Sequence, residues 1–173
     1  MIRFNVWVTL FLISLLGISG CQAVGGAPLC LELELNQEMY RPGEYIEAHV
    51  TLRNCSDEPV LANQRMAPTL DNSREGALRG EVSFMIITPE GIEPFINVRV
   101  DNRRSPQERD FREMEPDETV SRVYPISEYF SPLYLSGEYS VQAIYRNDWD
   151  LGDGRVAWEG EIFSNVVHYT VLP

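Results

Sequence analysis

Apolar and polar residues alternate along much of the chain with a period of two, which is the pattern of half-buried β-strands. The alternation is clearest over residues 29–35 and again over residues 45–53. Between these segments lies Arg41-Pro42-Gly43-Glu44, with Pro and Gly at the central positions that a type II turn favours. We expect the two segments to pair as antiparallel strands. Because type II turns splay hairpin strands, residues 36–44 form either this tight turn or a loop with pairing beyond it.

Pairing about the Pro42–Gly43 bond predicts a specific register. On the core side it places apolar residues opposite each other: Leu33 with Leu52 and Leu35 with Val50. On the outer side it places polar residues together: Glu32 with Arg53 and Glu34 with Thr51. The same register puts Cys30 opposite Cys55, where a disulfide can bridge two strands.

The remainder of the chain predicts further short strands separated by turn signals. These cover residues 59–62, 81–88, 92–100, 120–126, 139–145, 156–163 and 166–172. The apolar run 84–87 indicates burial on both faces, and residues 92–100 are the expected hairpin partner of 81–88. Residues 127–131 are expected to form a helical turn, whereas residues 101–118 and 147–154 are expected to be loops.

No segment keeps a helical period over three turns, so the fold class is all-β. About seven to nine short strands with intervening turns are typical of an antiparallel β-sandwich. We assign the sandwich to residues 29–173, preceded by residues 21–28 as a flexible tether and residues 1–20 as a leader.

Several short motifs resemble those of bacterial extracellular immunoglobulin-like domains: Tyr40-Arg41-Pro42-Gly43-Glu44, Leu52-Arg53-Asn54, Leu135-Ser136-Gly137-Glu138-Tyr139 and the closing residues 164–171. The resemblance covers roughly residues 29 to 173 and implies an immunoglobulin-like sandwich. It also implies that Tyr139 forms a tyrosine corner, in which the phenol bonds back to the backbone. Val141 stands where immunoglobulins carry the second inter-sheet cysteine, so that disulfide is absent. The Pro-Gly-Glu strand pattern is more loosely similar to bacterial intracellular-proteinase-inhibitor-like domains.

The N-terminus has the composition of an export signal. Arg3 precedes an apolar run from Val6 to Leu16, which is too short to span a bilayer comfortably. The following Leu16-Gly17-Ile18-Ser19-Gly20-Cys21 resembles the bacterial lipobox, which implies cleavage before Cys21 and lipidation of that cysteine. The alternative is an ordinary secretory signal with a chance cysteine. Since Gln22 is not the aspartate that often retains lipoproteins at the inner membrane, the outer membrane is expected in a two-membrane bacterium.

The chain has three cysteines, so lipidation of Cys21 leaves Cys30 and Cys55 as a pair in an oxidising compartment. We predict that they form a disulfide. The competing interpretation is two reduced structural cysteines. A metal site is a weaker hypothesis, because neither His49 nor His168 lies at ligand spacing from them.

The amino-acid composition argues against nucleic-acid binding and against catalysis. The formal net charge is −12, and such an acidic surface repels phosphate backbones, so we expect no nucleic-acid partner. All the basic residues are Arg, which removes lysine-based catalysis. With two histidines and no Gly-x-Ser-x-Gly motif, we expect no catalytic residues and no cofactor.

Two candidate sites remain. Asp148, Asp150 and Asp153 supply carboxylates for a weak calcium candidate, although their spacing differs from an EF-hand and also suits a plain hairpin loop. Tyr145, Trp149 and Trp158 are a candidate partner-binding surface, since aromatic residues dominate binding hot spots. The alternative is that Trp158 belongs to the core and Trp149 packs over the end of the sandwich.

These observations predict a non-catalytic module held at the cell envelope by a lipid anchor in the membrane, with a protein or glycan partner. The second hypothesis is a proteinase inhibitor that presents residues 101–118 or 147–154 as an extended loop.

Overall fold

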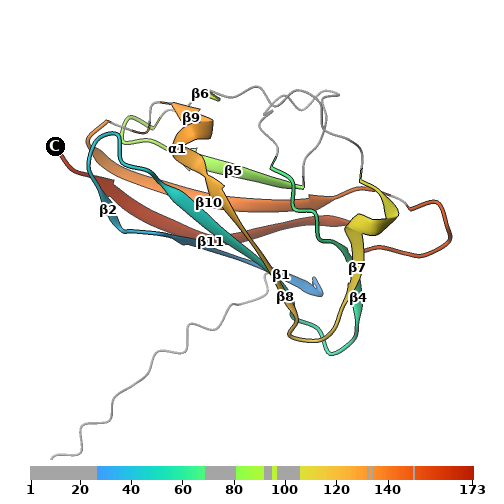
Figure 1. Ribbon diagram of the computed structural model, residues 1–173. Coiled ribbons are helices and arrows are strands. Elements are labelled where there is room, and N and C mark those ends of the chain that lie inside the picture. Colours follow the sequence, from blue (N-terminus) through green and yellow to red (C-terminus); the bar gives the residue numbers. More distant parts are fainter. Residues whose placement is uncertain are drawn as a thin grey trace, which may run out of the picture.

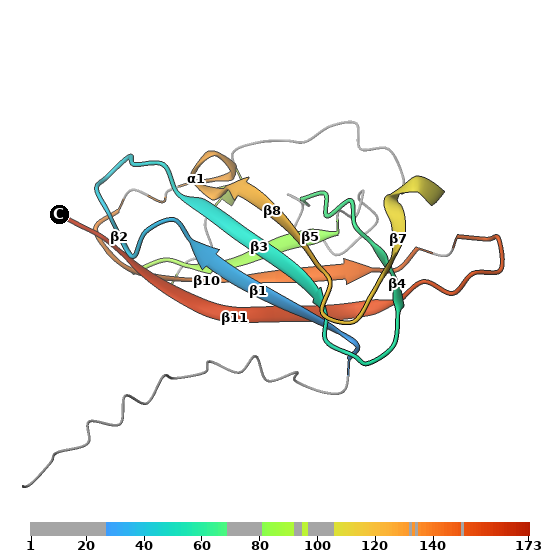
Figure 2. The same cartoon turned by 60° about the horizontal axis from the view of Figure 1, so that its bottom comes forward.

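The computed structural model describes residues 27–68, 81–91, 95–96, 106–131, 133, 135–149 and 151–173, which form an all-β sandwich (Figure 1). Sheet I has the strand order β1 (Leu29–Leu35), β3 (Glu47–Asn54), β8 (Thr119–Pro125). Sheet II has the order β2 (Met39–Tyr40), β11 (Gly160–Val171), β10 (Gly137–Asn147), β5 (Val82–Ile87). Figure 2 shows the strands of sheet I lying across those of sheet II, so the two sheets pack face to face.

Shorter elements complete the described chain. The strand β4 (Val60–Asn63) pairs with β7 (Phe111–Met114), which follows the 3-10 helix η1 (Glu108–Asp110). The strand β6 (Phe95–Ile96) pairs with β9 (Phe130–Ser131), which follows the single helical turn α1 (Ile126–Tyr129). The helical turn predicted over residues 127–131 is present at 126–129, whereas residues 130–131 form β9. The prediction that residues 92–100 pair with 81–88 is wrong for the described residues 95 and 96.

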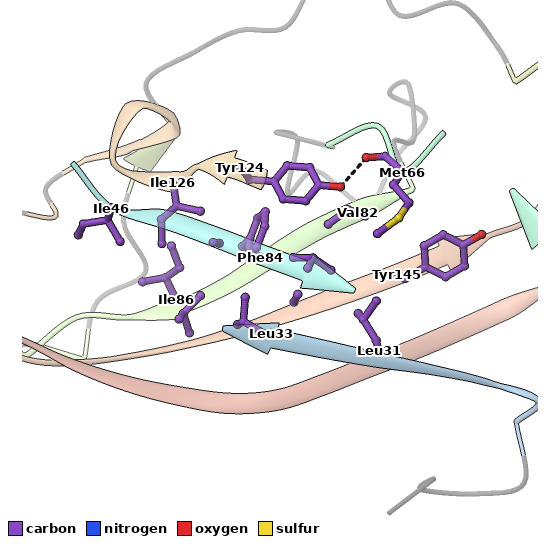
Figure 3. Close-up of a cluster of buried hydrophobic side chains, with 14 of the residues drawn as sticks. Leu31, Leu33, Ile46, Met66, Val82, Phe84, Ile86, Tyr124, Ile126 and Tyr145 are labelled. Carbon is purple, nitrogen blue, oxygen red and sulfur yellow. Dashed lines mark hydrogen bonds between the residues drawn. The ribbon is translucent and has the colours of Figure 1, made fainter. Parts of the chain in front are cut away.

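The core lies between the sheets and follows from the period-two pattern. Leu31 and Leu33 of β1 face inward together with alternate residues of β3, β5 and β10 (Figure 3). Tyr139 stacks on Tyr169 with ring centroids 4.9 Å apart, and Tyr40 meets Tyr169 edge-on at 5.5 Å. Aromatic pairs in these geometries add stability beyond the apolar area that they bury.

The predicted register of β1 and β3 is wrong by two residues. Leu33 lies opposite Val50, and Cys30 lies opposite Arg53 rather than Cys55. Glu32 accordingly faces Thr51, so the predicted Glu32–Arg53 pair does not form. A shift of two residues keeps every side chain on its expected face, because side chains alternate with period two.

The register shifts because the turn does not connect β1 directly to β3. The turn itself is present: the Glu44 N–H donates to the Arg41 carbonyl at 3.0 Å, and Gly43 has φ +82°. Within the connection, however, β2 crosses to sheet II and pairs in parallel with β11. The segment is therefore a loop between the sheets, which is the alternative that the sequence had left open.

A disulfide joins Cys30 to Cys55 across the end of this strand pair, with their Cα atoms 5.9 Å apart. Cys55 lies just beyond β3, and its N–H donates to the Pro28 carbonyl at 2.8 Å. The disulfide therefore runs diagonally, from Cys30 to a residue two positions beyond its direct partner Arg53, and it holds the first residues of β1 against the end of β3.

The last two predicted strands, residues 156–163 and 166–172, merge into one strand, β11, which leaves out residues 156–159 and Leu172. Ser164 and Asn165 form a β-bulge opposite Ala143 instead of a break. The Ser164 hydroxyl accepts the Ala143 N–H at 2.9 Å, and the Asn165 amide bonds both the N–H and the carbonyl of Leu33. The bulge therefore ties β11 to the edge of sheet I.

The predicted burial of residues 84–87 on both faces is also wrong. Phe84 and Ile86 are buried, but Met85 is 43% exposed and Ile87 is 51% exposed. The outer face of sheet II has no second layer in the described part of the chain, so only the inward residues of β5 are covered.

Tyr139 behaves as the resemblance implied. Its hydroxyl donates to the Leu135 carbonyl at 2.9 Å, and burial raises the pKa of the phenol. This bond holds the approach to β10 against the sandwich.

Candidate functional site

One end of the sandwich gathers most of the residues that the sequence singled out. Here the β10–β11 hairpin, the β4–β7 pair and the start of β5 meet, at the end where β4 and β7 lie in Figure 1. The Trp158 N–H donates to the Leu61 carbonyl and the Arg146 N–H to the Glu81 carbonyl, each at 2.8 Å. These bonds hold the end of β10 beside the start of β5, and the approach to β11 beside β4. We call this region the loop-bearing end.

Arg155 connects the two loops that the sequence proposed for protease inhibition. Its guanidinium donates to the Glu108 carboxylate in η1 at 2.8 Å and to the Asp153 carboxylate within its own loop. These bonds hold the pKa of Asp153 below its ordinary value. Because Glu108 lies half-way along the predicted 101–118 loop, the structure brings two segments distant in sequence to one place.

The prediction that residues 101–118 form a loop is wrong for part of that range. Residues 101–105 lie outside the described residues, whereas Phe111–Met114 forms β7 and pairs with β4. Phe111 and Met114 are buried, and the two charged residues between them are exposed. This spacing of buried positions does not alternate, which explains why the strand was missed.

The proposed aromatic surface is only partly exposed. Tyr145 is completely buried, and its hydroxyl donates to the Asn63 carbonyl at 2.8 Å, so assigning it to a binding surface is wrong. Burial also raises the pKa of this phenol. Trp158 is half-buried and stacks on Tyr145 with ring centroids 5.7 Å apart. Trp149 is half-buried. The two tryptophans therefore remain available at the surface while Tyr145 supports one of them from below.

The three aspartates proposed for calcium are not equivalent. Asp148 is exposed, Asp150 lies outside the described residues, and both carboxylate oxygens of Asp153 accept bonds from Arg155. Over the described ranges, no three acidic, His or Cys side chains are grouped so that they could hold a metal ion.

A buried ion pair at the base of this end was not predicted. The Glu81 side chain is 1% exposed and pairs with Arg65, whose side chain is 13% exposed. The Glu81 carboxylate also accepts the Ala67 N–H at 2.7 Å and the Asn63 amide at 3.1 Å. Arg65 and Glu81 are separated by a long polar segment, so no local spacing relates them. The only signal in the sequence was an acidic residue at the start of an otherwise apolar strand.

Two phenols hold the turn that carries Arg65. The Tyr124 hydroxyl donates to the Met66 carbonyl at 2.6 Å (Figure 3), and Tyr145 holds the Asn63 carbonyl as described. Met66 is buried with φ +48°, a left-handed conformation that is uncommon for a residue with a side chain. The hydrogen bonds from Tyr124 and Tyr145 hold the backbone on this turn in place. A strained backbone conformation persists only where its surroundings hold it in this way.

The chemistry available at the loop-bearing end is recognition through fixed charges and aromatic rings. Arg65, Arg146 and Arg155 are each paired with a carboxylate here. Both histidines lie elsewhere: His49 is on β3 and His168 is on β11 beyond the bulge, and both are exposed.

Comparison with known proteins finds no family model and no curated protein that matches the chain. Among the described residues, no helix has the length and apolar character needed to cross a bilayer. Residues 1–26, which include the predicted leader and Cys21, lie outside the described residues.

Proposed function

We propose that this protein is a bacterial lipoprotein whose immunoglobulin-like sandwich is a non-catalytic binding or assembly module of the cell envelope. The observation that carries the proposal is the disulfide between Cys30 and Cys55. Disulfides persist in oxidising compartments outside the cytoplasm. The pair leaves Cys21 as the one remaining cysteine, at the end of an apolar leader and in a lipobox-like sequence.

The short tether is consistent with this arrangement. The eight residues 21–28 span at most about 28 Å, so a lipid on Cys21 keeps the start of β1 near the membrane. Force transmitted through the tether acts on β1, an edge strand, directly beside the disulfide that clamps it to β3. Acyl chains on one residue provide stable anchoring, since each buried methylene contributes about 0.8 kcal/mol.

The topology supports the immunoglobulin-like assignment. Two packed sheets, a crossover of the chain between them at β2, and a phenol of β10 bonded back to the preceding turn are features that such domains share. Fold alone does not assign activity, so the binding role rests on the surface of the loop-bearing end. Trp149 and Trp158, which flank Arg155 in the sequence, are the residues we assign to a protein or glycan partner.

Metabolic labelling with an alkyne-bearing fatty acid tests the anchor. The full chain is expressed in a bacterium, and the expected result is a labelled protein whose mature N-terminus is Cys21. Cys21→Ala removes the label, whereas the double change of Cys30 and Cys55 to Ala retains it. A wild-type chain with Met1 intact, or with an unmodified thiol at Cys21, would refute the proposal.

Fractionation and binding test the remaining parts. In a two-membrane bacterium the wild-type chain is expected in the outer membrane, and Gln22→Asp is expected to move it to the inner membrane. A panel of extracellular proteases separates binding from inhibition: stoichiometric loss of protease activity would replace the proposed role by that of an inhibitor. Unchanged protease activity with micromolar protein leaves the binding role in place.

A further inference from the structure

We infer that the outer face of sheet II is a second interaction surface, which docks an apolar protein surface bordered by basic residues. Most of the large apolar side chains exposed on the described chain lie on this one face: Met39, Met85, Ile87, Phe163 and Val166. They come from three strands, β2, β5 and β11. Solvent-exposed apolar side chains gathered on one face commonly mark protein interaction sites.

The strand register places four of these side chains in neighbouring rows, and Met39 lies further along the face beside Thr170. Met85 of β5 and Val166 of β11 lie on either side of Gln142 of β10, and Ile144 lies beside Phe163. Neighbouring strands are about 4.8 Å apart, so side chains in such rows touch or nearly touch. The bulge at residues 164 and 165 has a direct consequence here: it adds a residue to β11, so that Phe163 and Val166 both point outward although they are three positions apart.

The face also carries polar residues: Gln142 lies at its centre, and Ser140 and His168 lie beside Ile87 in the next row. The Gln142 amide donates to the Ser164 carbonyl at 2.8 Å, which holds this central side chain down on the sheet. At the hairpin end of the face, Arg146 of β10 pairs with Glu161 of β11, so these charges neutralise each other. The central row of Met85, Gln142 and Val166 therefore has no charged side chain, in a chain of net charge −12.

The opposite end of the face has an excess of acidic residues, three glutamates against Arg41 just after β2, and this excess decides the kind of partner. Glu38 precedes β2, Glu90 lies in the turn after β5, and Glu138 lies on β10. All three are exposed, and none makes an ion pair with another part of the described chain. Charge complementarity across an interface speeds association and excludes wrong partners. A partner with an apolar centre and Lys or Arg at one end fits this arrangement.

The same acidic end disfavours two other occupants. A second copy would bring two strongly acidic molecules together, which costs electrostatic free energy. A membrane surface rich in anionic lipid would be repelled for the same reason. The inference rests on the proposed binding role but not on the lipid anchor, because the face is the same in an anchored or a free molecule.

Peptide binding to the full chain tests the inference. A lipidated chain is measured in a neutral phosphatidylcholine nanodisc, and an unlipidated chain is measured in buffer. The probes are two amphipathic helical peptides with identical Leu faces, one with Lys and one with Glu on the polar face. Fluorescence anisotropy is expected to show micromolar binding of the Lys peptide, about tenfold weaker binding of the Glu peptide, and weakening by salt. Empty nanodiscs supply the baseline.

Surface variants locate the site. Ile87→Ser and Phe163→Ser are each expected to weaken binding of the Lys peptide about tenfold. Val123→Ser is the matched control, because Val123 is exposed to the same extent as Ile87, 51%, but lies on β8 in sheet I. Ile87 and Phe163 are both exposed, so both variants should keep the wild-type circular dichroism spectrum and melting temperature. Glu138→Gln is expected to reduce the salt dependence.

Several results would overturn the inference. Equal binding of the Lys and Glu peptides, or equal effects of Ile87→Ser and Val123→Ser, would remove the assigned face or its charge preference. Dimerisation seen by ultracentrifugation and abolished by Phe163→Ser would assign the face to a second copy. Binding of the unlipidated chain to phosphatidylglycerol vesicles, lost in the same variant, would assign it to lipid. Fatty-acid labelling is read separately, so loss of the anchor and loss of the face are distinguishable.

Discussion

Replacement of Arg65 by Met tests the claim that a buried ion pair holds the loop-bearing end together. Methionine keeps most of the apolar stem of arginine but removes the guanidinium. The Glu81 carboxylate then remains buried, with the Ala67 N–H and the Asn63 amide as its neutral donors. The variant therefore isolates the contribution of the positive charge.

The expected loss of stability follows from the burial of the two side chains. Removing one partner of a buried pair generally costs about 3–5 kcal/mol, because an uncompensated charge remains. Two neutral donors stay in place and the Arg65 side chain is 13% exposed, so we expect the lower end, about 3 kcal/mol. For a domain of this size that corresponds to a fall in melting temperature of about 6–12 °C.

The matched control is Arg53→Met. Arg53 pairs with Asp117, but their side chains are 48% and 77% exposed, and exposed pairs contribute less than about 1 kcal/mol. Urea and thermal unfolding followed by circular dichroism measure both variants against the wild-type chain with its disulfide intact. Equal small losses in the two variants would refute the argument that burial of the Glu81 carboxylate makes this pair important.

Three further predictions concern other parts of the fold. Reduction of the Cys30–Cys55 disulfide should lower the free energy of unfolding by about 3.5 kcal/mol in the chain-entropy model, measured by urea unfolding with and without reductant; an unchanged midpoint would contradict it. Tyr139→Phe removes the phenol bond to a backbone carbonyl and should cost about 1–2 kcal/mol in the same assay, so a variant as stable as wild type would argue against a tyrosine corner. The pKa of Asp153 is lowered in the folded chain, so its contact with Arg155 stabilises the loop above the ordinary Asp pKa of about 3.9 and is lost as pH falls through the lowered value. Carbon-13 NMR should show Asp153 titrating below that ordinary value and returning toward it in Arg155→Gln; identical titration in both proteins would exclude the contact.

The alternation of apolar and polar residues predicted most of the longer strands and, where it is regular, which of their side chains face the core. Leu31, Leu33, Val50 and Leu52 face inward as the pattern predicted, although their register differs by two residues. The same side chains face inward in both registers, because successive side chains of a strand alternate between its two faces. A shift by two residues therefore changes the partner but not the face. The pairing of Cys30 with Cys55 was predictable for a related reason, since a diagonal contact on the same face is still within reach of a disulfide.

The tertiary structure alone decided the features that depend on contacts between distant segments. Met85 and Ile87 belong to an apolar run, and only the absence of a covering layer in the described chain makes them a surface. The pairing of Arg65 with Glu81 and the burial of Tyr145 likewise follow from how the ends of strands meet. Local sequence carries the period of an element, whereas burial and charge pairing depend on what packs against it from elsewhere in the chain.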